Sequence, residues 1–206
     1  MLKTNMTMER LVGFDAREMW VDPTASWSEK RRADYLFRPD VQKPLSTDTV
    51  VWPSVFDLNE NGRPPGCFGH QDLCDKLTDV QAPLASVQPG RCYVIAITVF
   101  TGSTSELQEW DELAPTTTPA ARDSSWTFLG FDVSDQWLLS GLSNCGFLPV
   151  VEDVSGLRAQ WGPQLNQYHL FDSFDAATAF KDLSNVRVQE HAPFFVFGLW
   201  LVQENV

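Results

Sequence analysis

The chain has 206 residues, of which 43% are hydrophobic and 12% aromatic, and this supply of apolar side chains excludes a disordered protein. Its 27 acidic and 15 basic residues give a formal net charge of −12, which disfavours direct binding to nucleic acid or to an anionic membrane. The longest apolar runs, 93–100 and 194–202, fall well short of the roughly 20 residues that a membrane-spanning helix needs.

The length fits a single domain, residues 1–206, with one core. Lys3, Glu9 and Arg10 interrupt the apolar stretch that a secretory signal would require, so we expect a cytoplasmic protein. A core with this many aromatic residues does not depend on disulfides to close. The four cysteines are therefore expected to be reduced thiols, with Cys92 as a small buried apolar residue.

In the first half of the chain, the clearest predicted element is a central strand over 91–100. Its β-branched and almost continuously apolar residues are typical of a strand that is covered on both faces. The elements expected before it are a capped helix over 26–38, a strand over 48–58 that Pro53 interrupts, a loop over 59–69, a short helix around 70–78, and a loop that contains Pro83.

In the second half, residues 103–114 form the best-defined predicted helix. Ser103 and Glu106 make a capping box, and Leu107, Trp110 and Ala114 recur on one face. The remaining expectations are a strand over 124–133, a helix over 134–142, helical pieces between 155 and 171 broken at Gly162-Pro163, a helix over 172–183 capped by Asp172, and a last strand over 193–202.

Strands and helices alternate only in part along this chain. We therefore predict an α+β domain in which short helices pack on a mostly antiparallel sheet of about four to six strands.

The acidic residues are unevenly distributed, and the whole net charge falls after residue 50. Four carboxylates surround one aromatic residue of the 103–114 helix. An aromatic anchor with a charged rim resembles the interaction surface of proteins that neutralise a basic partner. The alternative is an ordinary solvated helix with a buried Trp. The residues of this predicted partner-binding surface are Glu106, Glu109, Trp110, Asp111 and Glu112.

Three potential zinc ligands, Cys67, His70 and Cys74, follow each other at C-x2-H-x3-C. Together with Cys92 or Cys145 they could supply four ligands to zinc. A structural zinc site usually combines two such pairs, and this chain has one. The alternative is a loop thiol and a helix thiol beside an exposed histidine.

Nucleophilic catalysis would require an activated cysteine or serine with a base and an orienting group. Cys145, His169 and Asp172 could form such a trio. The alternative is that Asn144, Cys145 and Gly146 merely end a helix. No phosphate-binding, dinucleotide-binding or nucleophile-elbow motif occurs in the chain, so we expect no cofactor.

These patterns favour a binding protein over an enzyme. The leading hypothesis is a bacterial immunity or inhibitor protein that neutralises a basic partner, such as a toxin enzyme, through its acidic surface. The alternatives are a small cytosolic hydrolase or transferase that uses Cys145 and His169, and a zinc-stabilised adaptor.

Overall fold

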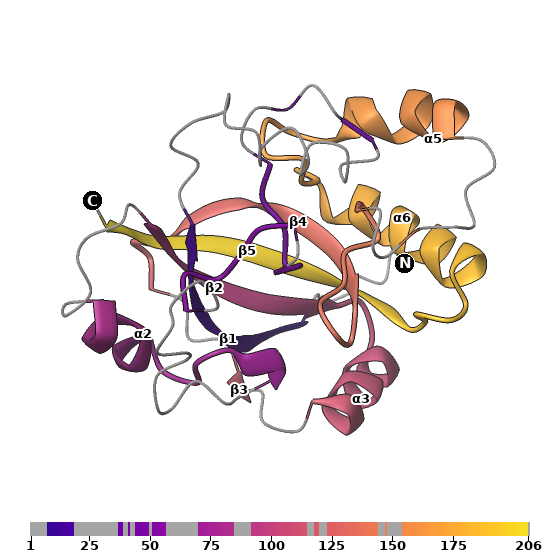
Figure 1. Ribbon diagram of the computed structural model, residues 1–206. Helices are drawn as coiled ribbons and strands as arrows, with labels where there is room; N and C mark the ends of the chain where they lie inside the picture. The colour runs from indigo at the N-terminus through magenta and orange to yellow at the C-terminus, as the bar shows by residue number, and fades with distance from the viewer. Residues whose placement is uncertain are drawn as a thin grey trace.

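The fold is built on one antiparallel sheet, shown in a computed structural model in Figure 1. The order of its strands is β3-β1-β2-β5-β4, so β2 and β5 occupy the interior. The strands are β1 (Met8–Glu18), β2 (Cys92–Thr101), the two-residue β3 (Thr118–Pro119), β4 (Thr127–Asp135) and β5 (Phe194–Asn205). The structure describes residues 8–18, 37–38, 41, 44–49, 51–56, 70–84, 92–114, 118–119, 123–143, 147 and 154–205.

Short helices pack against this sheet. They are the 3-10 helix η1 (His70–Asp72), α2 (Leu77–Leu84), α3 (Thr104–Leu113), α5 (Val154–Trp161), the 3-10 helix η2 (Gly162–Gln164) and α6 (Phe174–Arg187). The predicted α+β fold with a mostly antiparallel sheet is therefore confirmed. None of the helices in the described ranges combines the length and apolarity needed to cross a membrane.

Both faces of the sheet are covered, because the apolar residues of β2 and β5 alternate between two sides. Ile95, Ile97, Phe195 and Phe197 point to one face, where they pack with Trp110 of α3. On the opposite face, one cluster lies under α5 and α6, and another lies under α2. Figure 1 shows α5 and α6 close together. The near-continuous apolarity of β2 thus has the predicted cause, and β5 is covered on both faces in the same way.

A bulge between Phe128 and Gly130 bends β4 where it pairs with β5. Gly130 has a φ of 143°, and a Cβ at this position would lie 2.6 Å from the Cβ of Leu170. Only glycine accommodates both the backbone conformation and this close approach. The bulge lets the turn before α6 pack directly against the sheet.

Several elements match their predictions closely. The central strand, the helix from 104, the strand from 127 and the final strand are all present. The break at Gly162-Pro163 separates α5 from η2, as the loss of a backbone donor at proline predicts. The helix expected around 70–78 instead forms two pieces, η1 and the later α2, and Pro83 lies inside α2.

Other predicted elements are wrong. Residues 134–142 continue β4 to Asp135 and then form a tight turn, in which Ser140 pairs with Ser134, so there is no helix. Residues 51–56 form turns with a single bridge to β1 rather than a strand. Ser173, not Asp172, caps α6, because its side chain accepts from the backbone N–H of Ala176. The predicted 59–69 loop lies outside the described residues, and so does the predicted 26–38 helix except for residues 37 and 38.

Candidate functional site

The α3 helix begins as its sequence predicts, with Ser103 as the N-cap. The Ser103 hydroxyl accepts a hydrogen bond from the backbone N–H of Glu106, at 3.2 Å. The Glu106 carboxylate accepts from the backbone N–H of Gly102, at 2.8 Å, one residue earlier than a standard capping box. These bonds fix the first turn of the helix.

Trp110 holds the inner face of α3 in the core. Its side chain is fully buried, and its ring contacts those of Phe195 and Phe197 edge to face at centroid distances of 5.1 and 5.5 Å. The prediction that Trp110 is an aromatic anchor for a partner is therefore wrong. The alternative, a helix with a buried Trp, is correct for this residue.

The four carboxylates of the predicted surface fall into two pairs. Glu106 forms an ion pair with Lys181 of α6 at 2.6 Å, and Asp111 forms a longer one with Arg10 of β1 at 3.5 Å. Glu109 and Glu112 project into solvent. We call these two exposed residues the acidic face of α3. The paired carboxylates link α3 to α6 and β1, while the acidic face is exposed to solvent.

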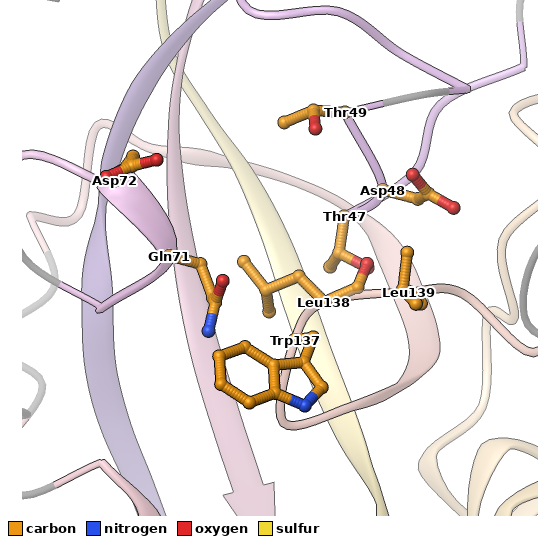
Figure 2. A pocket seen from close by; sticks show the side chains of 8 residues that line it. All are labelled: Thr47, Asp48, Thr49, Gln71, Asp72, Trp137, Leu138 and Leu139. Atoms are coloured by element: carbon orange, nitrogen blue, oxygen red, sulfur yellow. The ribbon is translucent and has the colours of Figure 1, made fainter. Parts of the chain in front are cut away.

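A pocket opens on the face of the sheet that α3 covers, and we call it the Trp137 pocket (Figure 2). The empty space of the pocket is about 460 Å³, counting the part that is open to solvent. Its walls come from three separate segments of the chain. The lining residues are Thr47, Asp48, Thr49, Gln71, Asp72, Trp137, Leu138 and Leu139.

The turn that carries Trp137 is held by one buried carboxylate. Asp135 Oδ1 accepts from the backbone N–H groups of Trp137 and Leu139 at 2.8 and 2.9 Å. Its other oxygen, Oδ2, lies 3.1 Å from Nδ1 of His191. Leu138 is buried beneath the turn, whereas the Trp137 side chain is 59% exposed. The turn therefore presents a large aromatic ring to solvent on a fixed backbone.

The wall at Thr47 is attached to β4 through the buried Asp132. Asp132 Oδ2 accepts from Ser46 Oγ at 2.8 Å and from the backbone N–H of Thr47 at 2.9 Å. Asp132 Oδ1 accepts from Ser140 Oγ at 2.6 Å. Burial raises the pKa of Asp132, and these hydrogen bonds oppose the rise. This carboxylate joins the wall at Thr47 to the turn that carries Trp137.

The wall at Gln71 and Asp72 has an unusual backbone. Both residues have positive φ, 50° and 61°, and Leu138 on the facing turn has a φ of 62°. Residues other than glycine rarely adopt this conformation, which costs of order 1 kcal/mol or more each. Three such residues line this one pocket.

The predicted zinc ligands do not form a site in the described part of the chain. Cys74 is disulfide-bonded, which corrects the expectation of four reduced thiols and removes this thiolate from zinc binding. Cys92 is a buried thiol that is not part of a disulfide, as predicted. Cys67, Cys145 and the side chain of His70 lie outside the described part of the chain. Among the described residues, no group of three or more His, Cys, Asp or Glu could hold a metal ion.

The predicted catalytic residues His169 and Asp172 lie in the turn before α6. His169 is buried, has a φ of 62°, and its backbone N–H donates to the carbonyl of Asn166. The Asp172 carboxylate accepts from the Asn166 side chain at 2.9 Å. Asn166 thus organises this turn, and Cys145 is not among the described residues. Catalysis by the trio stays a prediction.

Sequence reasoning missed the Trp137 pocket because it placed residues 134–142 in a helix. The available signal was Ser-Asp directly after an apolar strand, a pair that favours turns through side-chain bonds to the backbone. Comparison with known proteins gives no matching family model, no matching curated protein and no matching solved structure. The interpretation of the site therefore rests on its own residues.

Proposed function

We propose that this chain is a binding protein of the immunity or inhibitor type, which neutralises a basic protein partner through the acidic face of α3. A bacterial toxin enzyme is the kind of partner that such a surface suits. The observation that carries the proposal is the exposure of Glu109 and Glu112 on a helix that the buried Trp110 and the Glu106–Lys181 ion pair hold in place. A surface fixed before binding loses less conformational entropy in the complex.

The charge of the described fold supports the same proposal. The described residues include nineteen Asp and Glu against seven Lys and Arg, so they carry the whole net charge of −12. A field of this sign attracts a basic partner from a distance and accelerates encounter, and salt screens it. It repels nucleic acid and anionic lipid, so neither is proposed as a partner.

The test is capture of a partner from lysate of the native organism at low and at high salt, followed by measurement of association kinetics. The charge-reversed variant Glu109→Lys/Glu112→Lys should slow association at least about tenfold and weaken its dependence on salt. The matched control is Asp75→Lys/Glu190→Lys, which changes the charge equally at two other exposed positions. Equal effects of the two double variants would remove α3 from the interface.

The disulfide at Cys74 bears on where such a partner is met. Structural disulfides persist in oxidising compartments and are rare in the cytosol. This bond favours a location outside the reducing cytoplasm over the cytoplasmic location that the sequence suggested. The alternative functions, a hydrolase or transferase using Cys145 and His169 and a zinc-stabilised adaptor, have less support, since His169 is buried and Cys74 is oxidised.

A further inference from the structure

The exposed ring of Trp137 sits beside a pocket instead of packing in the core. Its side chain is 59% exposed, although Leu138 next to it is buried. A Trp in this position is a common centre of binding energy in protein interfaces. Because Asp135 fixes the backbone of the turn, little conformational entropy would be lost when a partner covers the ring.

The chemistry of the lining selects for a positively charged group. The eight lining residues offer an indole face, a carboxamide, hydroxyl groups and carboxylates, and none of the eight is basic. A cation placed over the face of Trp is attracted by the ring, and arginine makes this contact most often. Carboxylate and amide oxygens then accept the N–H groups of the guanidinium.

The lining side chains differ in how they could contact a bound cation (Figure 2). Gln71 extends toward the Trp137 ring from the opposite wall. The exposed Asp72 follows Gln71 on that wall and lies farther from the ring in this view. The Asp48 carboxylate is buried and turned away from Gln71, and it accepts from Ser143 Oγ at 3.4 Å. Of the two carboxylates, that of Asp72 is the one exposed to an incoming ligand.

We propose that the Trp137 pocket receives an arginine side chain of the basic partner, stacked on Trp137 and bound by Gln71 and Asp72. This inference rests on the proposed function and adds a second contact region on the α3 side of the sheet. The two regions have different roles. The acidic face of α3 acts mainly on the rate of encounter, and the pocket acts on the lifetime of the complex.

The direct test needs no identified partner. N-acetyl-arginine amide is titrated into ¹⁵N-labelled protein, and the indole N–H signal of Trp137, assigned with Trp137→Phe, is followed together with the Gln71 side-chain amide. We expect both signals to shift in a saturable manner. N-acetyl-citrulline amide has nearly the same shape without the charge, and it should bind at least about fivefold more weakly. Equal binding of the two compounds would overturn the proposal.

Two variants separate a specific pocket from general attraction to an acidic protein. Asp72→Asn should weaken arginine amide binding at least about threefold, because it removes the exposed carboxylate while keeping its shape. Asp75→Asn removes an equally exposed charge three residues away, outside the lining, and should leave binding unchanged. If both variants weaken binding equally, the pocket has no special affinity and the proposal is wrong.

A neutral sugar is the other ligand class that stacks on an exposed Trp ring. If methyl glucoside shifts the Trp137 and Gln71 signals and arginine amide does not, the pocket binds carbohydrate and the proposal is overturned. Failure of the pocket can be distinguished from failure of the acidic face. If Glu109→Lys/Glu112→Lys loses partner binding and Trp137→Ala keeps it, the acidic face is retained and the pocket is rejected. If Trp137→Ala loses partner binding and Glu109→Lys/Glu112→Lys keeps it, the pocket is retained and the acidic face is rejected.

Discussion

Arg17 and Asp15 form an ion pair in which both side chains are fully buried, with Arg17 Nε 2.8 Å from Asp15 Oδ2. The same guanidinium donates to the backbone carbonyls of Thr47 and Trp52 and lies 5.6 Å from the centre of the Trp52 ring. Asp15 in turn accepts from Ser54 Oγ at 2.7 Å. One buried pair on β1 therefore holds the segment that forms the Thr47 wall of the Trp137 pocket.

Replacing Arg17 by Met should lower the free energy of unfolding by about 3–5 kcal/mol, because it leaves the Asp15 carboxylate buried without its counterion. Denaturant unfolding measures this loss. Arg10→Met makes the same change on the same strand, where the pair with Asp111 is partly exposed at 26% and 43%, and it should cost about 0–1 kcal/mol. Similar losses in both variants would show that the buried pair does not hold the segment.

Asp132→Asn should also destabilise the fold, by about 1–3 kcal/mol. The two carboxylate oxygens accept from the Ser46 and Ser140 hydroxyls and from the backbone N–H groups of Thr47 and Val133. An amide nitrogen in place of one oxygen would face these donors with a donor of its own. Unfolding of the exposed variant Asp182→Asn, which should change stability by less than about 0.5 kcal/mol, is the control.

The pH dependence follows from the raised pKa of Asp132. Because the pKa of Asp132 is raised above its ordinary value of 3.8, the folded protein holds the carboxyl proton of Asp132 more tightly than the unfolded chain does. The contribution of Asp132 to stability is therefore greatest below that pH and declines as pH rises through the folded pKa. The difference in unfolding free energy between wild type and Asp132→Asn should be larger at about pH 4 than at about pH 7. A difference that grows with pH would mean that the hydrogen bonds outweigh burial.

The disulfide of Cys74 predicts a thiol count. Cys92 is not disulfide-bonded, so a bond within the chain joins Cys74 to Cys67 or Cys145 and leaves the other as a thiol. Protein unfolded without reductant should therefore react at two thiols, and at all four cysteines after reduction. Peptide mapping then identifies the partner cysteine. Four reactive thiols without reductant would restore the reduced, cytoplasmic interpretation.

Local sequence determined the elements whose signal lies within one segment. The apolar residues of 91–100 predict a central strand, because only a strand covered on both faces needs apolar side chains on both sides. Those of 193–202 predict the last strand, and its central place in the sheet came from the structure. Ser103 and the spacing of Leu107, Trp110 and Ala114 likewise predict α3, since a capped helix buries one stripe.

Only the tertiary structure decided where the turn of residues 136–143 would form and which Trp would face solvent. The helical spacing in that stretch competes with the bonds that Asp135 and Asp132 make to backbone and side-chain donors, and these bonds form only once β4 is in the sheet. Trp110 and Trp137 are chemically equal in the sequence. One is buried because α3 packs on Phe195 and Phe197, and the other is exposed because Asp135 turns the chain outward at the edge strand β4. Contacts between residues far apart in the chain set both outcomes.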